Sequence, residues 1–318
     1  MSKTEFVSKL REKRLILPPL SGYTDYPYRA ILAEFSPPFI CTEMISPYAV
    51  IHGNSKTMRM LRKDYGMHMN GVQLVGADVD AMRNAAKVVE NMGFDYIDIN
   101  MGCTVKKVTQ TGAGVSLMES EEKACLIVSA IIEAVSVPVT CKIRLGVNKK
   151  DKTAISLAKK LEAKGISALT VHGRSGESKF GSSIDYEGIK EIVECVNIPV
   201  ISNGGIYNGI EAVEMIRRTG SAAVMPGRGL IGNPWLVDEV QSIFSGAHYS
   251  SPSLFERKEI CLKHVRYLCD FYGEVSGIIL FRRIFGRYFS NSTNINNLRR
   301  SAQQINSFND VKSLIETV

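Results

Sequence analysis

Cys103 follows a short apolar run that is typical of a buried strand. Residues 96–100 alternate in the manner of a strand and the run stops at Gly102, so Cys103 is predicted to lie in the following loop. In α/β barrels the loops at the carboxyl ends of the strands form the active site, so a thiol there is a candidate for catalysis. A single cysteine is more often a small buried apolar residue, so the surrounding elements must decide between the two interpretations.

Short β-branched runs alternate with helical patterns between residues 15 and 236, which predicts repeated βα units around a parallel sheet. Eight strands are expected, at 15–19, 39–42, 71–74, 96–100, 139–143, 168–172, 200–203 and 222–226. Eight such units close a (β/α)8 TIM barrel. From about residue 250 the pattern is helical throughout. We therefore predict an α/β barrel domain at 1–240 and a small all-α domain at 250–318.

Polar residues and glycines recur at the ends of these predicted strands, where a core position would be apolar. They include Gln73, Asn100, Lys142, Arg144, His172, Arg174 and Asn203. Any one of them could simply terminate a strand, but their recurrence predicts a ring of site residues at one end of the barrel.

The last two predicted strands are followed by loops suited to a phosphate. Asn203, Gly204 and Gly205 follow one strand, and Gly227 and Arg228 follow the other. Backbone N–H groups of such loops approach an anion closely, and a guanidinium can hold two phosphate oxygens. Barrels often bind a cofactor phosphate there, and neither a P-loop nor a Rossmann glycine pattern is present. Flavin mononucleotide (FMN) suits this arrangement, with Gln73, Lys142 and His172 at the edge of its ring.

Composition indicates the partner and the compartment. The formal net charge of +7 fits either an anionic partner or simple solubility. Residues 275–309 contain five arginines and no acidic residue, which favours contact with a phosphate backbone. The seven cysteines form no pair or cluster at metal-ligand spacing, so we expect no metal and a reducing, cytoplasmic setting. No membrane span or secretory signal is expected, and the oligomeric state is left open.

Taken in order, these motifs resemble the tRNA-dihydrouridine synthases, most closely the bacterial B-type branch. The resemblance is carried by residues 17–25, 28–29, 42–44, 73–74, 100–103, 142–146, 172–175, 203–205 and 227–229. It implies FMN as cofactor, NADPH as its reductant and Cys103 as the acid that protonates C5 of a uracil after hydride reaches C6. The implied FMN contacts are Pro18, Pro19, Gln73, Lys142, His172, Asn203, Gly204, Gly205, Gly227 and Arg228. The implied contacts to tRNA are Asn100, Arg144, Arg174, Arg282, Arg283 and Arg287.

Four positions depart from the pattern of that family. Thr104 stands where a proline usually follows the cysteine, Gly176 and Ser178 replace an arginine and a glutamine, and Ile284 replaces a histidine. These departures leave the modified uridine undetermined. Three alternatives remain open: a dihydrouridine synthase acting on another RNA such as rRNA, a flavin-dependent dehydrogenase of a small molecule on the same barrel, and a flavoprotein or RNA-binding module without turnover.

Overall fold

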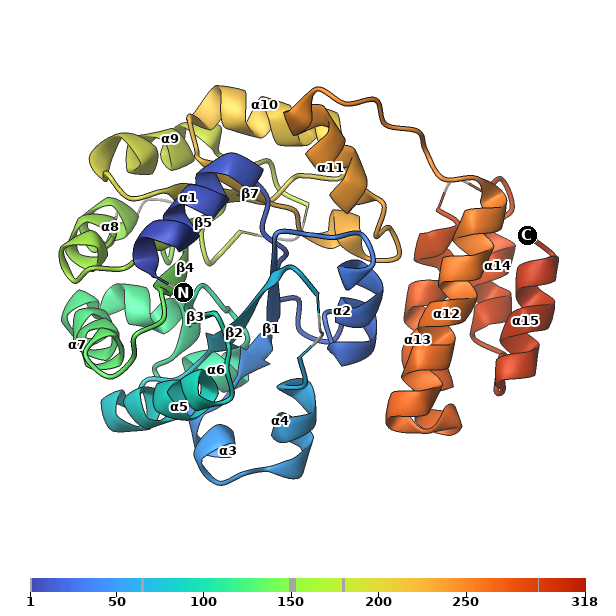
Figure 1. Ribbon diagram of the computed structural model, residues 1–318, viewed down its shortest axis with the longest axis horizontal. Coiled ribbons are helices and arrows are strands. Elements are labelled where there is room, and N and C mark those ends of the chain that lie inside the picture. Colours follow the sequence, from blue (N-terminus) through green and yellow to red (C-terminus); the bar gives the residue numbers. More distant parts are fainter. Residues whose placement is uncertain (1, 64–65, 149–152, 179–180, 291) are drawn as a thin grey trace.

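A computed structural model describes residues 2–63, 66–148, 153–178, 181–290 and 292–318. Within these residues one sheet contains seven parallel strands, which pair in the order in which the chain supplies them (Figure 1). The strands are β1 (Phe39–Ile45), β2 (Met69–Leu74), β3 (Tyr96–Met101), β4 (Val139–Arg144), β5 (Ala168–His172), β6 (Val200–Asn203) and β7 (Ala223–Met225). They confirm the predicted strands from the second to the eighth.

Residues 14–17 join the first and last of these strands. Leu15 forms an isolated parallel bridge with Val224, and Ile16 N–H donates to the Val224 carbonyl at 3.1 Å. On the other side, Leu17 N–H donates to the Phe39 carbonyl at 3.0 Å. The strand predicted at 15–19 is thus a single bridge, because the following residues, Pro18 and Pro19, have no N–H with which to extend a ladder. The fold is nevertheless the predicted TIM-like barrel.

Helices surround the barrel, and the longer ones bury apolar faces against the sheet (Figure 1). They are α2 (Tyr26–Ala33), α3 (Pro47–Ile51), α4 (Ser55–Met60), α5 (Val79–Asn91), α6 (Lys106–Thr109), α7 (Glu121–Ile132), α8 (Thr153–Ala163), α9 (Tyr186–Cys195), α10 (Gly209–Thr219) and α11 (Leu236–Ser245), with 3-10 turns η1 (Gly114–Glu119) and η2 (Arg228–Leu230). In α5, for example, Met82, Ala85, Ala86 and Val89 recur at helical spacing and are all fully buried.

The helix α1 (Lys3–Lys13) covers the amino end of the barrel. Ser2 and Glu5 form a capping box that starts it, and its buried residue Phe6 packs on Phe39 and Tyr96, the first residues of β1 and β3. The ring centroids of Phe6 and Phe39 are 5.1 Å apart. With the amino end filled by apolar side chains, a ligand can reach the barrel interior only at the carboxyl ends of the strands.

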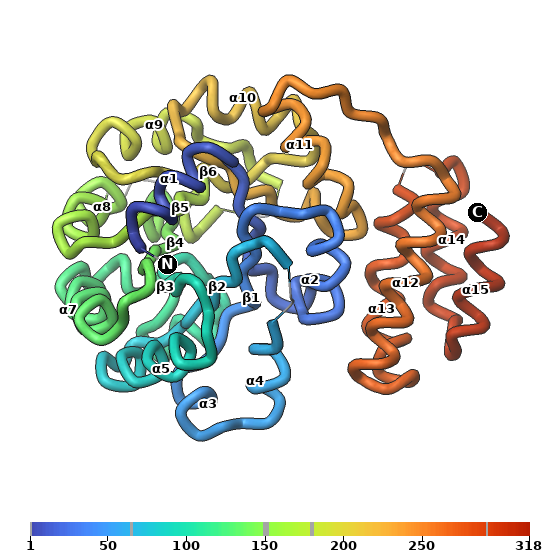
Figure 2. Tube along the Cα trace, in the orientation of Figure 1, coloured from blue at the N-terminus to red at the C-terminus, as the bar shows by residue number. Residues whose placement is uncertain are grey.

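Four helices follow the barrel, and the first of them contacts α2 (Figure 1). They are α12 (Leu254–Tyr272), α13 (Glu274–Tyr288), α14 (Ile295–Ala302) and α15 (Phe308–Glu316). Residues 246–253 connect α11 to α12 (Figure 2). The core of the four helices also includes Ile231 and Trp235, and α11 continues past residue 240. The domain division at 1–240 and 250–318 therefore stays a prediction.

Buried aromatic residues join the helices to the barrel. His264 of α12 is fully buried and stacks on Tyr28 of α2, with ring centroids 4.9 Å apart. Its Nδ1 lies 2.9 Å from the Tyr288 hydroxyl, whereas its Nε2 has no hydrogen-bond partner among the described residues. Tyr28 in turn accepts a hydrogen bond from Gly232 N–H at 3.1 Å. None of the described helices is long and apolar enough to cross a membrane.

Candidate active site at the carboxyl end of the barrel

The loop that carries Cys103 is held by hydrogen bonds from several directions. The Asn100 Oδ1 accepts the N–H groups of Gly102 and Cys103, at 3.1 and 2.9 Å. The Cys103 carbonyl accepts from Val115 N–H at 2.9 Å, and the Gly102 carbonyl accepts from Arg144 Nε at 2.7 Å. The Cys103 side chain is half-buried in this loop. A thiol is therefore fixed immediately after β3, where the sequence predicted it.

Gln73 and Asn100 lie on adjacent strands and bind each other. Gln73 is fully buried, and its Oε1 accepts from Asn100 Nδ2 at 2.7 Å. Its own Nε2 donates to Asp98 Oδ2 at 2.7 Å. An amide group has two N–H donors and two acceptor lone pairs, so Gln73 retains one of each for a ligand. The expected contact of Gln73 with a pyrimidine edge stays a prediction.

Lys142 lies half-buried at the end of β4 and donates from Nζ to Asn203 Oδ1 at 2.9 Å. Burial and then the charge of Arg144 lower the pKa of Lys142 to about 8, while Asp98 and Cys103 act in the opposite direction. The Asn203 side chain also donates to the Met225 carbonyl at 2.7 Å. Asn203 thereby links the ends of β4, β6 and β7.

Several cationic side chains of the site lie near His172. Burial, and then the nearby charges of Lys142, Arg144, Arg174 and Arg228 in that order, lower its pKa to about 2. The imidazole is therefore neutral at physiological pH, and an Arg174 Nη1 lies 3.5 Å from its Nε2. A concentration of positive charge around a neutral histidine is a suitable environment for an anionic ligand.

The loops after β6 and β7 differ in the space beside their glycines: a Cβ on Gly204 or Gly205 would lie 2.8 Å from Ile184, whereas the loop after β7 is open. Gly204 and Gly205 have φ values of 112° and 68°, a left-handed conformation that favours glycine. Gly227 has ordinary φ, and a Cβ added there would meet no atom within 4 Å. Packing within the protein therefore does not require a glycine at position 227. The exposed side chain of Arg228 follows directly. The open space at Gly227 fits an FMN phosphate.

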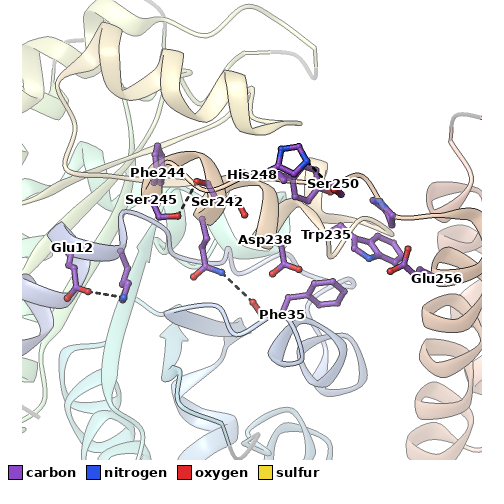
Figure 3. Close-up of a pocket in the computed structure, with 14 residues that line it drawn as sticks. Glu12, Phe35, Trp235, Asp238, Ser242, Phe244, Ser245, His248, Ser250 and Glu256 are labelled. Atoms are coloured by element: carbon purple, nitrogen blue, oxygen red, sulfur yellow. Dashed lines mark hydrogen bonds and ion pairs between the residues drawn. The ribbon is translucent and has the colours of Figure 1, made fainter.

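Pro18 and Pro19 follow the bridge that closes the barrel, Pro18 buried and Pro19 half-buried. Three cavities border the barrel or the helices that follow it. One of about 530 Å³ is lined by Gly22, Glu43, Tyr272 and Arg283, between the barrel and the helices. Another of about 460 Å³ borders Arg174. A third, of about 880 Å³, lies between α11, the connecting segment and α12, with Trp235 and Asp238 on its wall (Figure 3). It contains none of the predicted site residues.

The chain matches the family model described as "Dihydrouridine synthase (Dus)" over residues 16–318. It belongs to the dihydrouridine synthase family. This family is generally flavin-dependent. A probable tRNA-dihydrouridine synthase of Rickettsia conorii is 35% identical over 296 residues, 92% of this chain and 89% of that protein. The tRNA-dihydrouridine synthase B of Proteus vulgaris is 34% identical over 306 residues, 96% and 94% of the two chains.

Two solved structures share the fold. Morphinone reductase aligns with a TM-score of 0.51 at 17% identity, over 76% of this chain and 87% of that one. The 6-hydroxypseudooxynicotine amine oxidase of Pseudomonas geniculata aligns with a TM-score of 0.56 at 14% identity, over 74% and 47%. At such identities the alignments show the barrel alone.

The departures from the dihydrouridine synthase pattern have local explanations at two positions. A Cβ at Gly176 would lie 2.6 Å from the Val147 carbonyl oxygen, so the path of this loop excludes any larger side chain. Ile284 is 4% exposed in the core of the four helices, where a histidine would be desolvated. Ser178 bonds Ser175 through their hydroxyl groups at 2.9 Å, and Thr104 is exposed. The structure offers no account of the replacement at Thr104.

The three arginines of α13 that were expected to contact RNA have different surroundings. Arg282 donates to the Ile305 carbonyl and to Asn306 Oδ1, both at 2.9 Å. Arg283 donates to the Gly22 carbonyl, and its guanidinium carbon lies 5.0 Å from the centre of the Tyr23 ring. Arg287 is exposed near the end of α13. Their contact with RNA stays a prediction.

Two polar residues of the site were not assigned a role from the sequence. Asp98 and Thr140 are buried below the strand ends, and Thr140 Oγ1 donates to Asp98 Oδ1 at 2.6 Å. A signal was present, because Asp98 lies two residues before Asn100 and so on the same face of the strand. In the described residues, no group of three potential ligands is placed to hold a metal ion.

Proposed function

We propose that this protein reduces uridines in tRNA to 5,6-dihydrouridine, with FMN as its cofactor and NADPH as the reductant. Membership of the dihydrouridine synthase family and the names of relatives about one-third identical support this proposal. The observation that carries it is the position of Cys103: its thiol follows β3 beside Lys142 and Arg144 at the end of β4.

The strand-end residues divide between the cofactor and the base. The phosphate of FMN would be held by Gly204, Gly205, Gly227 and Arg228, and its ring by Pro18, Pro19, Gln73, Lys142, His172 and Asn203. When bound and reduced, FMN supplies a hydride to C6 of the uracil. A positive charge at Lys142 favours the negatively charged forms of the ring.

Cys103 would complete the reduction. Addition of hydride at C6 leaves negative charge on the uracil, which the positive charges of Lys142 and Arg144 stabilise. The Cys103 thiol gives its proton to C5 and remains as a thiolate, which solvent reprotonates. Asn100 and Arg144 both bind the peptide group that joins Gly102 to Cys103, so they fix the backbone from which the proton is delivered. Both residues are also proposed to contact the base.

The substrate RNA has to bring an unstacked uridine to this end of the barrel. Arg174 lies beside the mouth, and the exposed guanidinium of Arg287 belongs to the neighbouring helices. We infer that the RNA backbone lies across both parts of the chain and reaches Arg282 and Arg283.

The test uses purified protein and tRNA from cells that lack dihydrouridine. The protein should have a flavin spectrum that bleaches with NADPH under anaerobic conditions. Addition of the tRNA should restore the oxidised spectrum, and nucleoside mass spectrometry should detect dihydrouridine in the RNA. If ribosomal RNA reoxidises the flavin and tRNA does not, the substrate is ribosomal RNA and the proposed tRNA substrate is wrong. A reduced flavin that neither RNA reoxidises would refute the proposal.

A further inference from the structure

Asp98 is a buried carboxylate to which the proposed chemistry assigns no role. It is 4% exposed and lies in the middle of β3. The strand register pairs it with Gln73 on β2 and with Thr140 on β4. The three side chains therefore form one layer inside the barrel. A charge at such a position is costly unless hydrogen bonds satisfy both of its oxygens.

Both oxygens of Asp98 are satisfied, and one of the two donors has a fixed orientation. Oδ1 accepts from Thr140 Oγ1 at 2.6 Å, and Oδ2 accepts from Gln73 Nε2 at 2.7 Å. A hydroxyl can rotate to donate or accept, but an ionised carboxylate can only accept. Gln73 must therefore turn its NH₂ group toward Asp98, which leaves its oxygen facing the end of the strand.

The orientation of Gln73 determines that of Asn100. The Gln73 oxygen accepts from Asn100 Nδ2 at 2.7 Å, so the Asn100 oxygen faces the loop beyond β3. There it accepts the Cys103 N–H at 2.9 Å. From Cys103 to Asn100, to Gln73 and to Asp98, every donor points toward the carboxylate. Hydrogen bonds aligned in one direction polarise and strengthen one another.

Asp98 also bears on the charge of the site. Burial raises the pKa of Asp98, and the hydrogen bonds from Thr140 and Gln73 and the charge of Lys142 oppose that rise. In return Asp98 is the first of the two groups that oppose the lowered pKa of Lys142. The carboxylate and the ammonium group therefore favour each other's charged forms beneath the ring of strand ends.

We propose that Asp98 is a positioning residue: by accepting from Gln73 it sets both side-chain amides and so fixes the backbone of Cys103. Its effect on turnover rests on the proposed function, whereas the hydrogen-bonded series is a property of the fold. The hydrogen-bonded series has Asp98 at one end and the loop that carries Cys103 at the other. Replacing the carboxylate should therefore weaken the hydrogen bond of the Cys103 N–H, which is three hydrogen bonds away from Asp98 in the series.

A matched pair of substitutions separates this role from simple packing. Asp98→Asn preserves shape but exchanges one acceptor oxygen for an NH₂ group, so the direction of the series is no longer imposed. Thr140→Val removes the other donor to Asp98 and leaves the Gln73 branch intact. Hydrogen exchange of the amides in 101–104 is measured on the flavin-loaded protein. We expect exchange about tenfold faster in Asp98→Asn and little change in Thr140→Val, by analogy with residues that orient metal ligands.

A double variant tests the direction of the bonds. Combining Asp98→Asn with Gln73→Glu moves the acceptor-only group next to Asn100, whose Nδ2 can again donate to a carboxylate. Slow exchange at Cys103 should return, even if flavin affinity falls because position 73 is changed. Should Asp98→Asn melt too low for comparison, Gln73→Leu interrupts the same series one residue nearer to Cys103 and should speed exchange equally.

The proposal is overturned if Asp98→Asn and Thr140→Val, both folded, have the same exchange rates in 101–104 as the unaltered protein. Turnover provides a second readout: Asp98→Asn should lower kcat for dihydrouridine formation with KM for RNA nearly unchanged. If the unaltered protein forms no dihydrouridine, the proposed function fails, while the exchange rates still decide the role of Asp98.

Discussion

Cys103 is fixed through its main chain. Its N–H donates to Asn100 and its carbonyl accepts from Val115, whereas in the described part of the chain no hydrogen bond involves its thiol. Gly114 makes the close approach possible, since a Cβ there would lie 2.5 Å from the Cys103 carbonyl oxygen. This arrangement locates the sulfur without a hydrogen bond from any described residue to the thiol.

Replacing Cys103 should separate flavin chemistry from proton transfer. Cys103→Ala removes the acid, so kcat for dihydrouridine formation should fall by about 10²–10⁴-fold, as for other general acids. Flavin content and the rate of bleaching by NADPH should not change. Nucleoside mass spectrometry measures the product, and Cys195→Ala on α9 is the control because that cysteine is remote from the strand ends. Full activity in Cys103→Ala would contradict the assignment.

Alanine substitutions at the two glycines that follow β7 should have opposite effects on thermal stability and on flavin binding. Gly227→Ala adds a methyl group in open space, so the apoprotein should keep its Tm while the Kd for FMN rises by about tenfold, or about 1.4 kcal/mol. Gly229→Ala would place the new Cβ 2.4 Å from the Ile206 carbonyl oxygen and should lower the Tm directly. Flavin fluorescence titration and thermal melts distinguish them. An unchanged Kd in Gly227→Ala would argue against a phosphate at this loop.

At the scale of elements, strands were easier to predict than the way the barrel closes. The strand predicted at 168–172 coincides with β5, since β-branched runs bounded by turns are a local signal. Residues 15–17, which close the barrel, have a similar composition. Whether their N–H groups have hydrogen-bond partners depends on residue 224, which is distant in the sequence. The helix α1 was not predicted, although Ser2 and Glu5 at capping-box spacing and Phe6 and Leu10 one turn apart were a readable signal.

The site was predictable to the extent that it follows from strand ends. The sequence places Lys142 and His172 at the same end of the barrel because parallel strands share a direction. It cannot say which partner a side chain selects. Arg282 and Arg283 are adjacent in a basic stretch, yet one bonds within the four helices and the other reaches Gly22 on the barrel. That difference depends on which face of α13 packs against the barrel, which a charge pattern alone does not determine.

Arg283 should therefore couple the helices to the barrel. Arg283→Met retains the aliphatic stem but removes the contacts to the Gly22 carbonyl and the Tyr23 ring. We expect a loss of about 1 kcal/mol in docking free energy and faster hydrogen exchange in residues 20–25. Arg287→Met on the same helix is the control. Equal exchange rates in the two variants would assign Arg283 no coupling role.

At the scale of the whole molecule, the contact between barrel and helices depends on a histidine that must remain neutral. Burial lowers the pKa of His264 to about 3. The unfolded chain, in which histidine titrates near its ordinary pKa of about 6.5, therefore binds a proton first as the pH falls. The stability that this group contributes is complete above about pH 6.5 and is lost progressively toward pH 3.

Acidification below pH 6.5 should accordingly destabilise the protein through His264, whereas Asp25, whose pKa burial raises to about 6, acts in the opposite direction. Between pH 7 and pH 5 the loss from His264 should be about 2 kcal/mol at most. His264→Gln, which can still bond the Tyr288 hydroxyl but does not titrate, should have a flatter profile in this range. Denaturant melts at each pH measure it, with the exposed His248→Gln as control. Parallel profiles for His264→Gln and the unaltered protein would contradict the prediction.

The bridge between Leu15 and Val224 has a consequence for how the protein is made. During synthesis the first part of the barrel leaves the ribosome long before its partner on β7 exists. Until residue 224 emerges, the Leu17 side of the segment can pair with β1, but the Ile16 side has no strand to join. The amino end of the barrel, which Phe6 covers, is likewise incomplete during that time. Closure is therefore a late event in translation, and the nascent chain has to protect an open sheet edge until β7 arrives.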